Sequence, residues 1–123
     1  MDHHYDDQNI FARILRGEIP NDTVAETEHT LAFNDITPQA PVHVLVIPKG
    51  PYVTFDHFVG EGSEAEILDF WRTAARIAAE KGIDATGYRI ISNAGADGHQ
   101  EVPHFHLHLV GGHPTGRMLE KRM

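Results

Sequence analysis

Three histidines alternate with large apolar residues in the segment 104–110. Successive side chains of a β-strand point to opposite faces, so we expect the imidazoles on one face and the apolar side chains on the other. The imidazoles belong to His104, His106 and His108, and the apolar face to Phe105, Leu107 and Leu109. A strand that only faces water is one interpretation, but three imidazoles at a spacing of two residues are unusual for a plain surface.

Two kinds of chemistry use such a row of imidazoles. Histidine commonly ligates zinc, copper and iron, and two histidines of one strand can share an ion with a ligand from elsewhere, for which His43 is the candidate. A neutral imidazole can instead attack an electrophilic phosphorus atom and form a covalent intermediate that water later hydrolyses. The residue types alone leave both interpretations open.

An attack on phosphorus also needs donors for the phosphoryl oxygens, and the segment before the histidines offers them. Residues 93–98 form a turn-rich loop with two glycines, whose backbone amides can hold an anion. Asn93 and Gln100 can add side-chain donors. Histidines titrate near neutral pH, so their surroundings decide their charge.

His43 interrupts the apolar run 42–47, which has the pattern of a central strand covered on both faces. A buried imidazole is costly unless it meets a polar partner. His43 is therefore either a core residue with its own partner or, if this strand pairs beside segment 104–110, a further member of the imidazole face.

The other elements follow from hydrophobic periodicity and from capping residues. The pattern predicts a short helix over 8–16 capped by Asp6 or Asp7, and a long helix that begins at a Ser63–Glu66 capping box and ends at Gly82. Residues 55–62 are expected to be a loop with a short helical turn. Strands are predicted at 23–26, 31–36, 42–47, 88–92 and 104–110. Strands with short connections and segregated helices indicate an α+β fold with an antiparallel sheet.

Composition indicates a single domain over residues 1–123. The formal net charge of −8 argues against a nucleic-acid partner. No segment is long and apolar enough for a membrane span, and no signal peptide is visible. Because cysteine is also absent, we expect a cytoplasmic protein.

The order of residues in segment 104–110, His-Phe-His-Leu-His-Leu-Val, resembles the signature of the histidine triad (HIT) superfamily. The similarity extends from residue 9 to residue 112, and segments 10–11, 17–20, 31–36, 38–41, 43–49 and 93–100 resemble its histidine triad nucleotide-binding (Hint) branch. The resemblance implies a five-stranded antiparallel sheet with one long and one short helix, extended across a homodimer. It leaves residues 1–8 as an N-terminal extension and 113–123 as a C-terminal tail.

The resemblance also implies hydrolysis of the P–N bond of purine nucleoside 5′-phosphoramidates, with AMP or GMP as the nucleotide part and without a metal or other cofactor. By position, His106 is the nucleophile, His108 and His43 contact the phosphoryl group, and His104 supports the nucleophile. Asp35 matches the residue that binds the ribose. The apolar wall of the base pocket matches Phe11, Ile14, Ile36 and Leu45, and the polar residues around the α-phosphate match Asn93 and Gln100.

Two departures from the family pattern leave the preference for a leaving group open. Glu101 stands where eukaryotic relatives usually have a serine, and its carboxylate would repel phosphate unless it turns away or pairs. The tail after Gly112 lacks the tryptophan of those relatives. Two alternative functions remain: a dinucleoside polyphosphate hydrolase of the same superfamily, and a non-enzymatic nucleotide- or metal-binding module.

Overall fold

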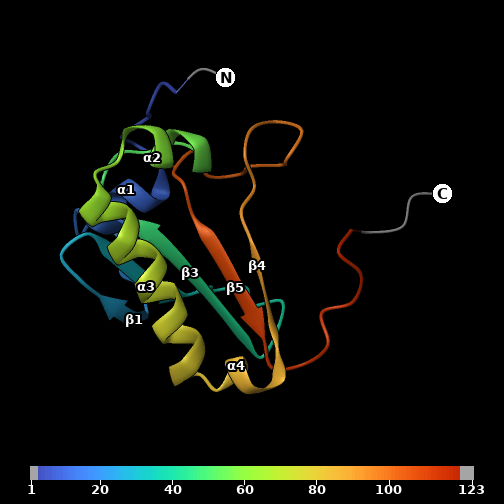
Figure 1. The fold of residues 1–123 in the computed structure, drawn as a ribbon. Helices are drawn as coiled ribbons and strands as arrows, with labels where there is room; N and C mark the ends of the chain where they lie inside the picture. Colours follow the sequence, from blue (N-terminus) through green and yellow to red (C-terminus); the bar gives the residue numbers. More distant parts are fainter. Residues whose placement is uncertain (1–2, 120–123) are drawn as a thin grey trace.

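The computed structural model describes residues 3–119, so parts of the predicted extension and tail lie outside the described residues. Five strands form one antiparallel sheet in the order β1-β2-β3-β5-β4 (Figure 1). The strands are β1 (Thr23–Glu26), β2 (Thr30–Asn34), β3 (Val42–Pro48), β4 (Tyr88–Ile91) and β5 (Leu107–Gly111). The predicted α+β fold with a five-stranded antiparallel sheet is confirmed.

Four helices accompany the sheet: α1 (Ile10–Leu15), α2 (Phe55–Glu61), α3 (Glu64–Glu80) and α4 (Ile83–Thr86). The capping box between Ser63 and Glu66 starts α3 as predicted, and Gly82, at φ 75°, follows its end. The structure therefore has two short helices more than the one long and one short helix that the resemblance implied. Among residues 3–119, no helix combines the length and the apolar character that crossing a bilayer requires.

The helical segments differ in detail from the sequence predictions. Asn9, rather than Asp6 or Asp7, caps α1, because its side chain accepts the Ala12 N–H. Residues 55–61, expected as a loop with a helical turn, form a helix because the Thr54 side chain caps it at the His57 N–H.

The predicted histidine strand begins three residues late. Strand β5 starts at Leu107, so His104 and His106 precede the sheet ladder. In this stretch the chain makes local and long-range backbone bonds instead, from His104 N to Val102 O and from Phe105 N to Tyr52 O, both 2.8 Å. The alternation of faces nevertheless holds, because Phe105, Leu107 and Leu109 all lie in the core on the α3 side.

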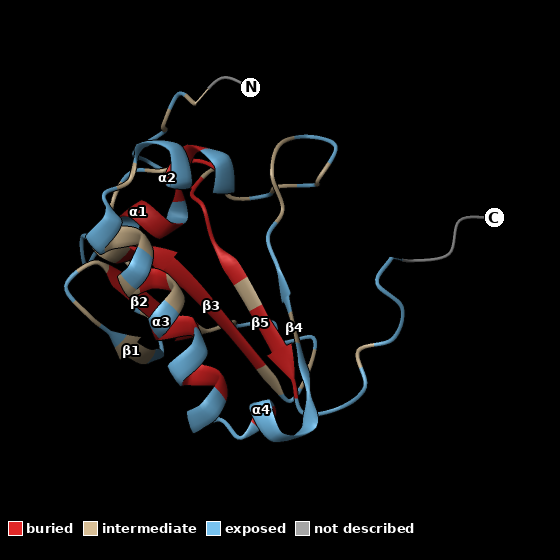
Figure 2. Cartoon of the chain, viewed as in Figure 1, coloured by how far each residue is buried: buried red, intermediate tan, exposed pale blue. Residues whose placement is uncertain are grey.

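The two faces of the sheet bury different clusters. Helix α3 lies across one face over the large apolar core, and α1 covers part of the other with a smaller cluster (Figure 1). Strand β3 is almost completely buried, whereas the edge strand β4 is largely exposed (Figure 2). The smaller cluster consists of Phe11, Ile14, Leu31, Phe33, Leu45 and Ile47. The triad histidines and His43 lie on this second face.

Candidate active site

Pairing of β3 with β5 decides the position of His43. Leu45 lies opposite His108 in the register, and His43 opposite Val110, so that the two imidazoles are diagonal neighbours on one face. His43 Nε2 is 2.9 Å from His108 Nδ1. His43 therefore belongs to the imidazole face, the alternative that its sequence position had left open.

The His106 imidazole donates a hydrogen bond to its own chain. Its Nδ1 lies 2.7 Å from the backbone carbonyl of His104, and since a carbonyl only accepts, the proton sits on Nδ1. The neutral ring then has its lone pair on Nε2. Burial lowers the pKa of His106, which keeps the ring neutral near pH 7. The hydrogen bond thus leaves an unprotonated nitrogen for attack.

His43 and His108 are protonated on Nε2, whereas His106 is protonated on Nδ1. The backbone N–H of Gln39 donates to His43 Nδ1 at 3.1 Å, so His43 is protonated on Nε2 and donates from there to His108 Nδ1. The neutral His108 ring is consequently a donor through Nε2. Burial, helped by the neighbouring His106 and His43, lowers the pKa of His108 to about 4. Two adjacent imidazoles of this site therefore have opposite roles, His106 as acceptor and His108 as donor.

His104 is fully buried and lies behind the site rather than in it. Its Nε2 donates to the carbonyl of Pro48 at 2.8 Å, and its Nδ1 accepts the hydroxyl of Tyr5 at 2.7 Å. Burial lowers the pKa of His104 to about 4, so the ring is neutral. Sequence reasoning missed Tyr5, because an isolated tyrosine in the predicted extension carries no pattern.

A cavity of about 480 Å³ opens in front of His106 and His108. Its apolar lining comes from Phe11, Leu45 and Val102, and the Phe11 ring meets the His106 ring edge-on at 5.0 Å between centroids. Its other polar lining residues are Asp35, Thr37, Gln39, Asn93, His99 and Glu101. A space with one apolar part and convergent polar groups is typical of a small-molecule site.

His43, which the resemblance placed at the phosphoryl group, does not line the cavity and reaches it only through His108. Three further residues that the resemblance placed around the base and the phosphate lie elsewhere. Ile36 is 94% exposed and does not line the cavity, because it follows the end of β2 in a bend. Ile14 faces another hollow beneath α1. Gln100 is a structural residue here: its amide donates to the carbonyls of Val53 and Val102 and accepts the Gly95 N–H, which fixes the loop after β4.

Two carboxylates face the imidazoles. Asp35 and Glu101 both line the cavity, and their charges oppose the effect of burial on the pKa values of His106 and His108. Glu101 Oε1 accepts from His99 Nε2 at 3.1 Å, so this carboxylate pairs, one of the two arrangements that would limit its repulsion of phosphate. His99 itself has a φ of 58°, a region that non-glycine residues rarely occupy.

Asp35, His43 and His108 are close enough to suggest a metal site, since their ligand atoms lie within 4.8 Å of one another. A histidine binds a metal through an unprotonated nitrogen. His43 directs its proton toward this group, because its Nδ1 is occupied by the Gln39 N–H. The hydrogen bonds of the site therefore fit a network of donors better than a resident metal ion.

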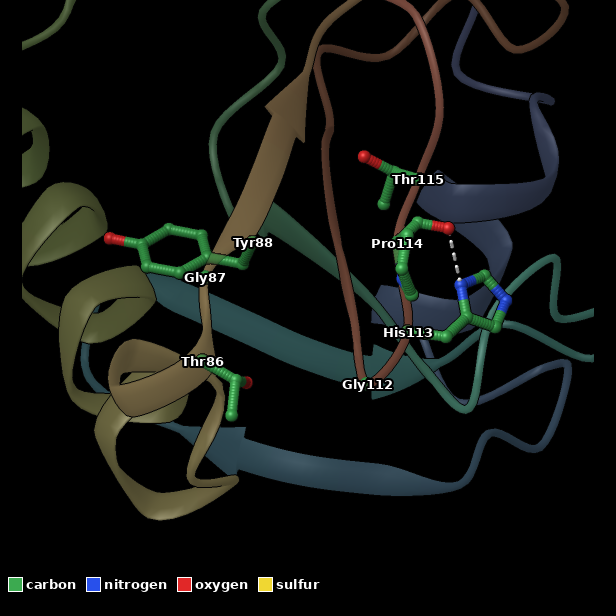
Figure 3. Close-up of a pocket in the computed structure, with 7 residues that line it drawn as sticks. All are labelled: Thr86, Gly87, Tyr88, Gly112, His113, Pro114 and Thr115. Carbon is green, nitrogen blue, oxygen red and sulfur yellow. Dashed lines mark hydrogen bonds between the residues drawn. The ribbon is translucent and has the colours of Figure 1, made fainter.

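A second hollow, of about 430 Å³, lies where the chain after β5 passes the start of β4 (Figure 3). The lining includes Tyr88, Gly112 and His113, whose Nδ1 donates to the Pro114 carbonyl at 2.9 Å. None of the triad residues lines it. The cavity in front of His106 is therefore the candidate active site.

Fold and site together define a histidine triad protein, and comparison with known proteins agrees. The family model of the HIT domain matches residues 16–115, and the chain belongs to this family. It is 55% identical over 117 residues to an uncharacterized 13.2 kDa HIT-like protein of Azospirillum brasilense, covering 95% of this chain and 96% of that protein.

Two further relatives carry functional names. A protein of Escherichia coli strain K12 named purine nucleoside phosphoramidase is 43% identical over 113 residues, which are 92% of this chain and 94% of the relative. The crystal structure of a HIT family hydrolase from Legionella pneumophila superposes with a TM-score of 0.80 at 39% identity, covering 87% of this chain and 95% of the other. The chain thus has the fold of the HIT hydrolases.

Proposed function

We propose that this protein is a nucleoside phosphoramidase, which cleaves the P–N bond of purine nucleoside 5′-phosphoramidates. The observation that carries the proposal is the direction of the His106 proton. Because Nδ1–H donates to the His104 carbonyl, Nε2 is the unprotonated nitrogen of a residue that lines the cavity. A positioned neutral imidazole is a competent nucleophile toward phosphorus.

In the first step, the lone pair of His106 Nε2 forms a bond to the α-phosphorus, and the P–N bond to the amine breaks. The amine leaves with the electron pair of that bond and takes one proton from solvent. In the second step, a water oxygen attacks the phosphorus and the bond to Nε2 breaks. The second step releases the nucleoside monophosphate and returns one proton, so that the enzyme regains its starting state.

The remaining groups stabilise this chemistry electrostatically. His108, held as a donor by His43, can donate from Nε2 to a phosphoryl oxygen, whose charge grows in the transition state. His106 becomes cationic when it bonds to phosphorus, and the His104 carbonyl 2.7 Å from Nδ1 stabilises that charge. We assign Asp35 to the ribose hydroxyls, Asn93 to the phosphate, and Phe11 and Leu45 to the base.

The name of the Escherichia coli relative supports the proposal, since it shares 43% of its residues with this chain over most of both lengths. The test is steady-state hydrolysis of adenosine 5′-phosphoramidate, compared with diadenosine polyphosphates, with and without a chelator. We expect the phosphoramidate to be the better substrate. We expect chelation to change its rate of hydrolysis by less than about twofold, because a protonated His43 Nε2 cannot ligate a metal ion. A faster rate on the dinucleotide, or no turnover of any nucleotide, contradicts the proposal.

We further propose that the enzyme is a homodimer that joins β4 edge to edge. Strand β4 ends the sheet, and Tyr88 and Ile90 are 48% and 49% exposed on it (Figure 2). An apolar groove lined by Trp71, Ala74 and Ile90 continues this surface onto α3. An exposed apolar edge strand pairs readily with another chain. Light scattering should give twice the 13.7 kDa mass of one chain, and a monomeric mass contradicts the dimer.

A further inference from the structure

We propose that Tyr5 is a positioning residue of the active site: its hydroxyl fixes the His104 ring, and through the His104 carbonyl it holds His106 in the form with a free Nε2. Tyr5 lies outside residues 16–115, which the family model matches, and in the segment predicted as an extension. The kinetic consequence of this inference rests on the proposed function, whereas the structural one does not.

The need for such a residue follows from the late start of β5. His104 and His106 lie before Leu107, so no ladder of the sheet holds their backbone. The His104 carbonyl is nevertheless the acceptor that fixes the His106 proton, at 2.7 Å. Its position therefore depends on local contacts. The Phe105 N–H, which shares a planar peptide group with this carbonyl, donates to the Tyr52 carbonyl and gives one constraint.

The His104 ring supplies a second constraint, because both of its nitrogens are bonded. Nε2 donates to the Pro48 carbonyl at the end of β3, and Nδ1 accepts from Tyr5. The ring is 0% exposed, so water is not available to replace either partner. A ring held from both sides cannot turn, and its own carbonyl is held with it.

Tyr5 is in turn held on both sides along the chain. After it, the Asp6 carbonyl accepts from the Asn9 side chain at 2.7 Å, at the start of α1. Before it, the His3 ring stacks on His57 at 4.4 Å between centroids, and His3 Nε2 donates to Asp56 at 3.0 Å. The segment before α1 is thus docked onto α2, with the tyrosine between the two anchors.

Removing the hydroxyl leaves His104 Nδ1 buried without a donor. Such a group is strongly disfavoured, so we expect the ring to shift until Nδ1 finds a partner. That shift moves the carbonyl that fixes the His106 proton. His106 then populates both neutral forms, and the one with its proton on Nε2 cannot attack.

Two-bond proton–nitrogen NMR of the imidazoles tests the structural step, in Tyr5→Phe and in Tyr52→Phe as matched control. Tyr52 also loses a hydroxyl that hydrogen-bonds, to Glu66, but that hydroxyl touches no triad residue. We expect His106 to be protonated on Nδ1 in the parent and in Tyr52→Phe, and to show a mixture of both forms in Tyr5→Phe. Unchanged His106 signals in a folded Tyr5→Phe protein overturn the proposal.

Kinetics of the same variants test the catalytic step. We expect kcat of Tyr5→Phe to fall about tenfold with KM within about twofold, because His104 and Tyr5 do not line the cavity. A merely structural role would lower the melting temperature and leave kcat unchanged below it, which would overturn the proposal. If the parent protein turns over no phosphoramidate, the proposed function fails, and the NMR comparison still decides the role of Tyr5.

Discussion

Two groups of histidines lie beside carboxylates: one at the candidate site, which includes His106, and one between the N-terminal segment and α2, which includes His57. Of these two buried residues, only His106 keeps an unprotonated ring nitrogen. In the first group, the His106 proton is directed to a backbone carbonyl, and Nε2 keeps its lone pair. In the second, the His57 Nδ1 accepts the Val53 N–H at 2.9 Å, so its proton is on Nε2, 3.4 Å from a Glu61 oxygen. His57 has thus used its lone pair on its own chain.

The difference shows that the backbone partner, rather than the neighbouring acid, decides what a buried imidazole can do. A carbonyl partner leaves an unprotonated nitrogen, and an N–H partner leaves a donor. The same rule accounts for His43, whose Nδ1 accepts the Gln39 N–H and which therefore donates to His108. It also explains why His57 offers no lone pair to a metal ion, although its ligand atom lies within 4.8 Å of those of His3 and Glu61.

The largest expected effect comes from exchanging the same residue type in both groups. His106→Gln should reduce kcat/KM by at least about 1,000-fold, because glutamine has no nucleophilic nitrogen. His57→Gln should reduce activity by no more than the roughly tenfold expected of Tyr5→Phe, because it removes only the ring on which His3 stacks. It should also destabilise the fold by about 1–3 kcal/mol, since the buried Val53 N–H loses its acceptor. Steady-state kinetics and urea unfolding measure the two effects. A roughly 1,000-fold loss of activity in a folded His57→Gln protein would break the comparison.

A second effect follows from burial of neutral imidazoles at the site. In the unfolded chain, His104 becomes protonated as the pH falls below about 6.5. In the folded chain, its pKa of about 4 means that protonation occurs only at a lower pH. Stability is therefore lost as the pH falls from about 6.5 toward 4, and His104 alone contributes a loss of about 2 kcal/mol between pH 7 and pH 5. His108 acts in the same direction. Urea unfolding at both pH values checks this, and equal stabilities would mean that these rings are not held neutral.

The smallest effect extends the comparison to apolar residues. Leu45 is 6% exposed and lines the cavity, whereas Ile36 is 94% exposed and does not. Leu45→Ala should raise KM for the phosphoramidate about fivefold, because a nucleoside loses an apolar contact. Ile36→Ala should change KM by less than about twofold. Equal increases in the two variants would show that Ile36 contacts substrate after all.

Much of the fold was predictable from local pattern. The Ser63–Glu66 capping box and the helical spacing after it mark α3, and the apolar run 42–47 marks the central strand β3. These signals are strong because periodicity and capping act over a few residues. Helix α2 was expected only as a helical turn within a loop, and α4 was missed, because a helix of one or two turns has too few positions for a periodic pattern.

The site was predictable only in part, because loops and long-range contacts place several of its residues. His106, His108 and Asn93 line the cavity as expected, and so do Phe11, Asp35 and Leu45. Gln100 and Ile36 do not, because the loop after β4 and the bend after β2 direct them elsewhere. The partner of His104 could not be found by pattern, since Tyr5 is 99 residues away in the chain.

The sequence by itself determined that three imidazoles share one side of the chain and that Phe105, Leu107 and Leu109 secure the other. That much follows from alternation, which is a property of neighbouring residues. Only the tertiary structure decided which nitrogen of each ring carries the proton. The partners lie 56 residues away for His104 at Pro48 and 65 for His108 at His43. The partners of His106 and His43 are only two and four residues away, at His104 and Gln39, but they belong to irregular segments whose path the fold sets. A proton's position on an imidazole depends on the atom that it faces, and the alternation of residue types does not specify that atom.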